Sequence, residues 1–302
     1  MINTGFSEIN EDRLNYEGNG FWYCEIAVTG ACNFNCTYCN RFNAELDYDK
    51  TCRFVDQYKH TLKHIQITGG EPTLYLKLLW LLKFIRDRGI KIGLSTNGSA
   101  DYNFYDYLGV KMFSISLDDY DTDILEKRGY REINKVISNI KKLSKKYYVN
   151  VGLVIDSLNC GRVDKIIEYI LGLGVTDIKL SVSTKDSTKP VFNRARDYSR
   201  YPILNYRVKR FLEGKPMRGI PEGENFKCSL VRNDISIVGN KHFPCLVYAR
   251  EKGQAIGELS DNVYADRLKW YEQHDPSQDP ICNKYCMDFK CEFNRSKSAI
   301  IK

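Results

Sequence analysis

Short apolar runs alternate with longer amphipathic stretches along the first 182 residues. The apolar runs predict six β-strands, at residues 21–29, 64–68, 91–95, 111–117, 148–155 and 177–181. The stretches between them have helical spacing and predict four helices, at residues 45–63, 74–88, 131–146 and 163–171. Strands that alternate with helices form a parallel sheet with right-handed crossovers. Eight such units close a barrel, so six predict an open (β/α)6 partial TIM barrel of the α/β class.

The pattern changes after residue 182. Residues 198–212 predict one more helix, and residues 234–244 predict a β-hairpin that turns at Gly239 and Asn240. The remaining C-terminal segments carry cysteines on what we expect to be short hairpin-like runs. We therefore expect four parts, namely a lead-in (1–20), a core (21–184), a basic linker region (185–225) and a small cysteine-rich domain (226–302).

Composition narrows the class of protein. The chain has 302 residues, of which 43% are hydrophobic and 27% are charged, as is typical of a globular protein. No apolar run approaches the roughly 18 residues that a membrane span needs, and the polar first 20 residues do not resemble a signal peptide. We therefore expect a cytoplasmic protein with no membrane partner. In that compartment, eleven cysteines indicate metal or redox chemistry rather than disulfides.

Positive charge is concentrated in one part of the chain. The net charge is +7, and residues 185–252 hold 15 Lys and Arg against 7 Asp and Glu, so the rest of the chain is nearly neutral. Such a surplus suits an anionic partner, for example a nucleotide, a nucleic acid or a phosphorylated molecule. A solvated, arginine-rich surface is the alternative, and the spread of these charges over the whole stretch favours it.

Three cysteines fall within eight residues directly after the first predicted strand. Cys32, Cys36 and Cys39 have the spacing C-x3-C-x2-C. Thiolates this close together suit a soft metal centre. A [4Fe–4S] cluster normally takes four thiolates, so three would leave one iron open, as catalytic metal sites leave one position open. A structural zinc site is the alternative, but such sites usually pair two halves, and no fourth ligand follows nearby.

Short polar motifs follow the predicted strands. Residues 69–72 (GGEP) follow the second strand, Thr96 and Asn97 end the third, and Ser116 and Asp118 end the fourth. In open α/β sheets, ligands bind at the carboxyl ends of the strands. The shared position of these motifs therefore predicts one binding site at that edge. It is stronger support than any single motif, because Gly-Gly and Pro are also common in plain strand-to-helix turns.

The cysteine motif, with the aromatic Tyr38 before its last cysteine, resembles that of the radical S-adenosylmethionine (SAM) superfamily, and residues 69–72 resemble the GGEP motif of the same family. The resemblance implies that Cys32, Cys36 and Cys39 hold a [4Fe–4S] cluster. The open iron would bind the amino and carboxylate groups of SAM. Reduction would then cleave the sulfonium and yield a 5′-deoxyadenosyl radical.

The resemblance also implies a cofactor site made of Tyr38, Gly69, Gly70, Glu71, Pro72, Thr96, Asn97, Ser116 and Arg128. Glu71 would accept a charge-assisted bond from the ammonium of the methionine moiety. Arg128 lies where relatives often carry an arginine for the cofactor carboxylate, although it could equally be a surface residue. Asp118 would contact the substrate or cap the following turn.

Five cysteines near the C-terminus form a second candidate metal site: Cys228, Cys245, Cys282, Cys286 and Cys291. Their layout resembles the auxiliary-cluster domains called SPASM and twitch. The full SPASM pattern has seven or more cysteines, so five imply a single auxiliary [4Fe–4S] cluster and one spare cysteine. Cys228 and Cys245, which flank the predicted hairpin, are the most secure ligands. A structural zinc knot is the alternative.

Three other cysteines remain. Cys24 is predicted to be packed in the core and Cys52 to be inert on a polar helix. Cys160, which follows the fifth strand, is a candidate hydrogen-atom donor.

Together these features predict a radical SAM enzyme that abstracts hydrogen from an unactivated carbon and takes electrons from a reductant such as flavodoxin or ferredoxin. Relatives with auxiliary clusters often modify peptides, so a peptide or protein side chain is the substrate that we rank first. The basic stretch supports a nucleotide, nucleic acid or other anionic molecule as the second choice, and dehydrogenation of a small-molecule alcohol is the third. A non-catalytic iron–sulfur electron carrier is a remote alternative, because it leaves the strand-end motifs without a role.

Overall fold

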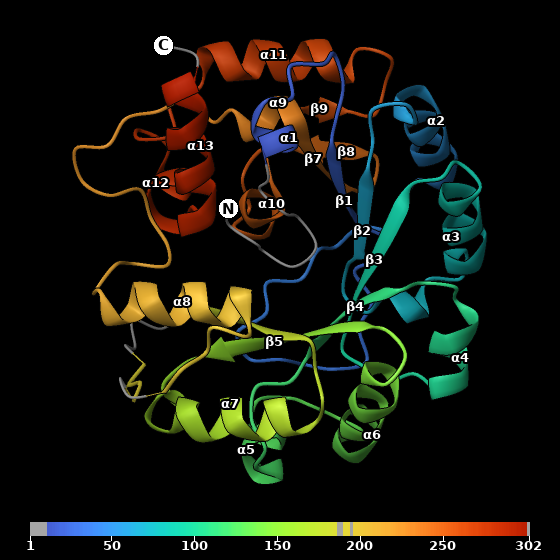
Figure 1. Ribbon diagram of the computed structural model, residues 1–302. Helices are drawn as coiled ribbons and strands as arrows, with labels where there is room; N and C mark the ends of the chain where they lie inside the picture. The colour runs from blue at the N-terminus through green and yellow to red at the C-terminus, as the bar shows by residue number, and fades with distance from the viewer. Residues whose placement is uncertain (1–10, 186–189, 194–195, 301–302) are drawn as a thin grey trace.

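Six parallel strands form the centre of the computed structural model, which describes residues 11–185, 190–193 and 196–300 (Figure 1). The strands are β1 (Tyr23–Ala27), β2 (His64–Thr68), β3 (Lys91–Thr96), β4 (Met112–Ser116), β5 (Tyr148–Ile155) and β6 (Asp177–Val182). They lie side by side in chain order, all parallel. Within the described residues β6 pairs only with β5, so the sheet stays open. The predicted open (β/α)6 barrel is confirmed.

Four predicted helices cover the outer face of this sheet: α2 (Tyr48–Tyr58), α3 (Leu78–Arg86), α6 (Ile133–Ser144) and α7 (Val163–Gly172). Three of them, α2, α3 and α6, are shorter than predicted. Asp47 caps α2, since its carboxylate accepts from the Lys50 amide at 3.0 Å. Pro72 begins a separate 3-10 turn (Pro72–Leu74) ahead of α3. The short helices α4 (Tyr102–Tyr107) and α5 (Thr122–Lys127) are not predicted, because six residues give too little periodicity.

The C-terminal part of the chain extends the same sheet. Strand β7 (Asp234–Val238) pairs in parallel with β1, with Cys24 opposite Ile235 and Ile26 opposite Ile237. Strands β8 (Lys241–Phe243) and β9 (Gly257–Glu258) follow in antiparallel order. The predicted hairpin is confirmed, and its turn contains Gly239 at a φ of 66°, a value that favours glycine. The C-terminal cysteines are therefore attached to the core sheet through β7.

Helices carry two of these five cysteines. The segment contains α9 (Leu230–Asn233), α10 (Leu246–Arg250), α11 (Val263–Gln273), α12 (Pro280–Tyr285) and α13 (Asp288–Ile300), and α1 (Glu11–Leu14) packs on α13. The prediction of hairpin-like runs is wrong for Cys282 and Cys291, which lie on α12 and α13, and for Cys286 between them. The predicted helix at 198–212 is present as α8 (Pro202–Leu212). Its first turn is capped by Asp177 of β6, which accepts from the amides of residues 203 and 204 at 2.9 and 3.1 Å.

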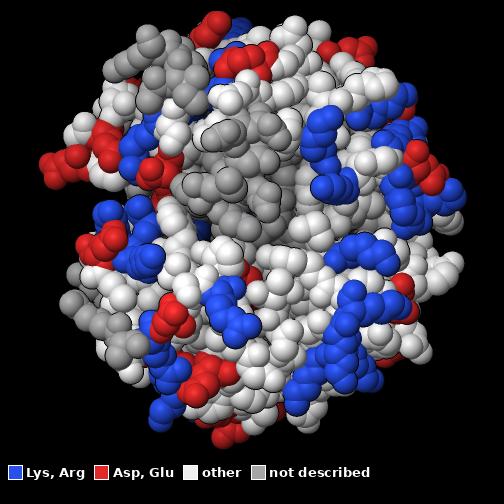
Figure 2. Space-filling model, in the orientation of Figure 1, with Lys and Arg blue, Asp and Glu red and all other residues white. Residues whose placement is uncertain are grey.

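Charged side chains are widely distributed over the surface. Figure 2 shows Lys and Arg on much of one face, interspersed with acidic and uncharged residues rather than gathered in one block. Part of the basic 185–252 stretch lies elsewhere, since Arg218 and Arg250 line an internal cavity. In the part of the chain that is described, no helix has both the length and the apolar character that crossing a membrane requires.

Candidate active site and metal centres

A cavity of about 410 Å³ lies at the carboxyl ends of the parallel strands. Cys32, Cys36 and Cys39 contribute to its wall, and so do predicted residues from three strand ends, namely Gly69, Gly70, Thr96, Asn97 and Ser116. Tyr38 also lines it. The structure thus brings together the cysteine motif and most of the strand-end motifs, as the parallel topology predicts.

Close backbone packing fixes the cysteine loop from one side. A Cβ on Gly70 would lie 2.2 Å from the carbonyl oxygen of Ala31, and one on Gly69 would lie 2.5 Å from that of Thr29. The Gly70 amide donates to Thr29 at 2.7 Å, and the Glu71 amide donates to Ala31 at 2.8 Å. The two glycines therefore serve a close approach, but to the chain that leads into the cysteine loop as well as to the cavity.

A second glycine contact, which the sequence does not reveal, fixes the loop from the other side. Gly129 has a φ of 87°, and a Cβ there would lie 2.0 Å from the carbonyl oxygen of Asn35. The amide of Asn35 donates to Gly129 at 2.9 Å, and that of Thr37 donates to Arg128 at 3.2 Å. The turn after α5 thus holds the middle of the cysteine loop in place.

The three thiols of this loop have the chemistry of a cluster site. Burial, the nearby Asp118 and the other two sulfurs raise the pKa of Cys36 to about 12, and burial also raises the pKa of Cys32. Thiolates in this setting need a cationic metal centre to stabilise them. These thiols therefore fit an iron–sulfur centre, which would bind them as deprotonated thiolates.

The spacing of the sulfurs separates a cluster from a single ion. A tetrahedral zinc ion with Zn–S bonds of about 2.3 Å holds its sulfurs about 3.8 Å apart. Among the described residues, the one group of three or more His, Cys, Asp and Glu ligand atoms mutually within 4.8 Å is His274, Asp279 and Cys282. The three loop sulfurs are not all within that distance of one another, which suits a cluster in which each cysteine binds a different iron.

Glu71 does not face the cavity. It is fully buried, and its carboxylate accepts from the Thr73 amide at 3.1 Å, the Thr73 hydroxyl at 2.8 Å, the Thr96 hydroxyl at 2.7 Å and the Asn97 amide at 2.7 Å. Burial raises the pKa of Glu71, while these hydrogen bonds oppose the rise. In this structure the carboxylate has a positioning role, since Glu71 joins the ends of β2 and β3, and its contact with the methionine ammonium stays a prediction. Pro72 is buried beside it, at the start of the 3-10 turn.

Replacing Glu71 by glutamine should expose this role. The side-chain amide of glutamine would place an N–H group against the hydrogen-bond donors that now face the carboxylate. At least one of these buried donors would then lose its acceptor. We expect the free energy of unfolding to fall by about 1–3 kcal/mol, measured by urea denaturation. Glu126→Gln, at an exposed position of α5, is the control and should leave the unfolding curve unchanged. Equal stability of Glu71→Gln and wild type would contradict the positioning role.

Asp118 and Arg128 form a buried ion-pair network behind Tyr38 rather than part of the cavity wall. The Tyr38 hydroxyl donates to Asp118 at 2.6 Å, and the Arg128 guanidinium lies 3.2 Å from Asp118 and 2.8 Å from Asp156. Asp118 also accepts from the Val154 amide at 2.7 Å. In this structure the two residues position Tyr38 and the end of β5, and the contacts of Asp118 with substrate and of Arg128 with the cofactor carboxylate stay predictions.

Cys160 lies outside the cavity. It begins a 3-10 turn (Cys160–Arg162) after β5, and its sulfur faces the carbonyl oxygen of Ser157 at 3.8 Å. This position does not support the predicted hydrogen-atom donor. Cys24 is buried in β1, as predicted.

Several cavity residues are missing from the sequence prediction: Gln66, Ser95, Ser114, Lys179 and Ser181. All five are polar residues that directly follow a buried apolar residue in β2, β3, β4 or β6. Because neighbouring side chains on a strand point to opposite faces, such polar positions mark the face that lines the barrel interior. That signal was available in the sequence.

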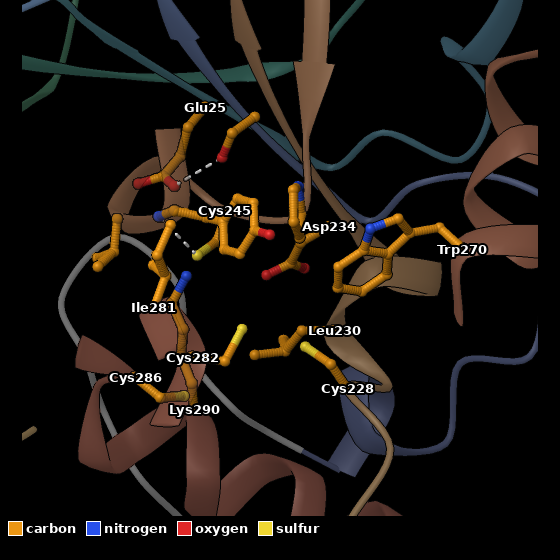
Figure 3. A pocket seen from close by; sticks show the side chains of 14 residues that line it. Glu25, Cys228, Leu230, Asp234, Cys245, Trp270, Ile281, Cys282, Cys286 and Lys290 are labelled. Carbon is orange, nitrogen blue, oxygen red and sulfur yellow. Dashed lines mark hydrogen bonds between the residues drawn. The ribbon is translucent and has the colours of Figure 1, made fainter. Parts of the chain in front are cut away.

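A second pocket brings together four of the five C-terminal cysteines: Cys228, Cys245, Cys282 and Cys286. Figure 3 shows Cys228, Cys245 and Cys282 pointing toward a common space, although they come from different segments. Burial and the neighbouring Cys245 raise the pKa of Cys228 to about 11, so these thiols also suit metal-bound thiolates. Cys291 is buried beside the pocket, with its sulfur 3.7 Å from the carbonyl oxygen of Gly219. Four converging cysteines match the number that one [4Fe–4S] cluster takes.

Known proteins place this site in context. Residues 26–170 match the family model described as the Radical SAM superfamily. The chain is 27% identical to the "Tungsten-containing aldehyde ferredoxin oxidoreductase cofactor-modifying protein" of Pyrococcus furiosus, over 82% of each chain. It is 30% identical to a "Probable GTP 3′,8-cyclase" of Pyrococcus abyssi, over 43% of this chain and 46% of the cyclase, so it spans about half the length of that relative.

Solved structures show the same fold. The native anSMEcpe structure with bound AdoMet has a TM-score of 0.61 at 16% identity and covers 92% of this chain and 96% of its own. Streptococcus suis SuiB bound to the precursor peptide SuiA also has a TM-score of 0.61, at 15% identity, and covers 87% and 66%. The family model, the fold and the cysteine loop agree: residues 26–170 of this chain match the radical SAM superfamily.

Proposed function

We propose that this chain cleaves SAM reductively and uses the resulting 5′-deoxyadenosyl radical to abstract hydrogen from a carbon of a substrate bound in the strand-end cavity. The observation that supports this proposal most directly is that Cys32, Cys36 and Cys39 share one cavity with the polar ends of β2, β3 and β4. These cysteines would hold the [4Fe–4S] cluster. When bound, the cluster and SAM supply the radical chemistry.

The protein's own residues bind, orient and shield in this proposal. Asn97 and Ser116 offer hydrogen-bonding groups to the cofactor from the wall of the cavity. The Asn97 side chain is held by bonds to Asn33 at 2.7 Å and to Ser99, so its direction is fixed before a ligand enters. Tyr38, fixed by its 2.6 Å bond to Asp118, supplies an apolar surface beside the cysteines. A fixed, partly enclosed cavity keeps water from a reactive radical.

A single auxiliary [4Fe–4S] cluster in the second pocket is part of the proposal. Four cysteines converge there, and Glu25 and Lys290 line both that pocket and the strand-end cavity. The two sites therefore share part of one wall. An auxiliary centre so close to the substrate could accept an electron from a substrate radical. Flavodoxin or ferredoxin remains the proposed reductant for the first cluster.

The test combines metal content with product formation. Protein reconstituted with iron and sulfide without oxygen should contain about eight iron atoms per chain, measured by inductively coupled plasma mass spectrometry. With SAM and dithionite it should release 5′-deoxyadenosine, measured by liquid chromatography. A fully iron-loaded preparation that releases no 5′-deoxyadenosine would overturn the proposed activity. About four iron atoms and one zinc ion per chain would show instead that the second pocket holds a structural zinc ion.

The substrate class is the open part of the proposal. The sequence ranks a peptide or protein side chain first, and SuiB and anSMEcpe, whose structures share the fold, are described with bound peptides. Likeness at 15–16% identity carries the fold only. The charges of the cavity wall instead favour the second-ranked class, an anionic substrate, because Lys179, Arg218, Arg250 and Lys290 line the cavity. The curated relatives, which include GTP cyclases, agree with this preference.

A further inference from the structure

Positive side chains gather on the wall of the strand-end cavity that lies away from the GGEP loop. Lys179 comes from β6 and Lys290 from α13. Arg218 lies on a segment after β6 that pairs with Met287 through an isolated β-bridge. Glu25 and Glu251 are the acidic residues that line the same cavity. The wall therefore has more positive than negative groups.

Within the described residues, no carboxylate lies within 4.0 Å of the charged nitrogens of Lys179, Arg218 or Lys290. Arg218 donates from Nε to the carbonyl oxygen of Val182 at 3.2 Å, but its Nη1 is buried with no hydrogen-bond partner. Glu25 is used elsewhere, since its carboxylate accepts from the Ser236 hydroxyl at 3.2 Å.

Most other buried cations of this fold pair with a carboxylate; Arg267 is an exception, since it donates to three backbone carbonyl oxygens. Arg128 pairs with Asp118 and Asp156, Arg207 pairs with Asp288, and Lys297 pairs with Glu17. Burial of a charge without a partner is costly. The cavity cations thus depart from the pattern of the rest of the molecule.

Electrostatics show the same shortage of negative charge around Lys179 and Arg218, whereas the pKa of Lys290 is raised, because Cys245, Glu25 and Asp234 outweigh its burial. Burial and the neighbouring Arg207, Lys290 and Arg218 together lower the pKa of Lys179 to about 8, while Glu25 opposes them. Burial also lowers the pKa of Arg218. Cations kept in an unfavourable position at a cavity wall are typical of a binding site, where the ligand supplies the missing charge.

We propose that Lys179, Arg218 and Lys290 bind an oxoanion group of the substrate, a phosphate or a carboxylate. This rests on the proposed function and names the substrate class of the same site. The planar guanidinium of Arg218 presents paired donors that match either group. The bound group would hold the rest of the substrate between this wall and the Cys32–Cys39 loop.

Two features separate this subsite from the cofactor site and from nucleic-acid binding. The strand-end groups expected to contact SAM come from β2, β3 and β4, whereas the cations come from β6, α13 and the segment at residue 218. Arg250 is set apart from the trio, because its Nη1 lies 3.8 Å from the Cys39 sulfur and its guanidinium stacks on Phe42. A cavity of about 410 Å³ admits a small molecule, not a duplex.

Equilibrium binding tests the proposal without turnover. Full-length reconstituted protein, saturated with SAM and without reductant, is titrated with pyrophosphate or with succinate by isothermal titration calorimetry. We expect one of the two probes to bind, and the tighter one identifies a phosphate or a carboxylate as the recognised group. In Arg218→Gln the dissociation constant should rise about tenfold or more. Arg53→Gln, at an exposed position of α2, is the matched control and should bind as wild type does.

Further variants keep the result decisive if Arg218→Gln does not fold. Lys179→Met should weaken binding to a similar degree, and Arg218→Lys should restore part of it. Failure of both probes to bind wild type, or wild-type affinity in Arg218→Gln and Lys179→Met, overturns the proposal. So does competition between SAM and the probe, since the cations would then serve the cofactor. None of these outcomes depends on 5′-deoxyadenosine formation, so the subsite and the proposed activity can fail separately.

Discussion

Replacing Cys36 by alanine is expected to abolish the release of 5′-deoxyadenosine. Cys36 is the middle of the three cavity cysteines and the one whose pKa rises to about 12, through burial, Asp118 and the two neighbouring sulfurs. A metal centre that stabilises this thiolate binds it tightly, and without it two cysteines are too few to hold the cluster. Mutation of an outer-shell partner of a metal site alone lowers metal affinity or activity about 10–100-fold. Loss of a ligand should therefore lower product release more than about 100-fold. The iron content should fall from about eight to about four atoms per chain.

Two other cysteine variants show whether the effect belongs to this site. Cys228→Ala removes a proposed ligand of the second pocket, and its iron content should also fall to about four, yet it should release more 5′-deoxyadenosine than Cys36→Ala. Cys52→Ala, on α2 and outside both sites, should retain full iron content and product release. Wild-type product release from Cys36→Ala would exclude the cysteine loop as the radical source.

The strands and the location of the site follow from local sequence. Strand β2 begins and ends where its apolar run does, and β5 does so too. The parallel topology then brings the ends of β2, β3 and β4 together, so the cavity could be predicted without long-range information. Local pattern works here because short buried strands and their polar ends are encoded within a few residues.

The roles of individual polar residues could not be predicted in this way. Glu71 and Arg128 stand in the expected motifs, but both turn away from the cavity. Their direction depends on partners that are distant in sequence, Thr96 and Asn97 for Glu71, and Asp156 for Arg128. A motif therefore identifies the site, whereas tertiary contacts decide which members touch a ligand.

The C-terminal helices escaped prediction for a related reason. Helix α12 is only six residues long and starts at Pro280, capped by the carboxylate of Asp279, which accepts from the Cys282 amide at 2.8 Å. Helix α13 is longer, but its apolar positions are sparse among charged residues. Pairing of β7 with β1 joins segments about 210 residues apart, which no local pattern reveals. The convergence of four cysteines thus depends on the tertiary structure.

The buried network of Asp118 and Arg128 makes Arg128 a residue of large effect on stability. We expect Arg128→Met to lower the free energy of unfolding by about 3–5 kcal/mol, because it leaves Asp118 and Asp156 without their buried cation. The guanidinium also lies 5.0 Å from the Tyr38 ring, so the cysteine loop loses a contact as well. Urea denaturation of the purified protein measures the change. Arg196→Met, whose partner Glu168 is exposed, should leave the unfolding curve unchanged.

A double variant tests whether unpaired charge is the cause. Burial raises the pKa of Asp118, and Arg128 opposes that rise, so loss of Arg128 leaves the carboxylate in an unfavourable ionised state. Arg128→Met combined with Asp118→Asn removes both charges of this pair and leaves only Asp156 without its cation, while the amide oxygen can still accept from the Val154 amide. The double variant should therefore be more stable than Arg128→Met alone, a non-additive result that shared partners produce. If the two substitutions instead add their costs, Arg128 stabilises the fold by packing rather than by charge.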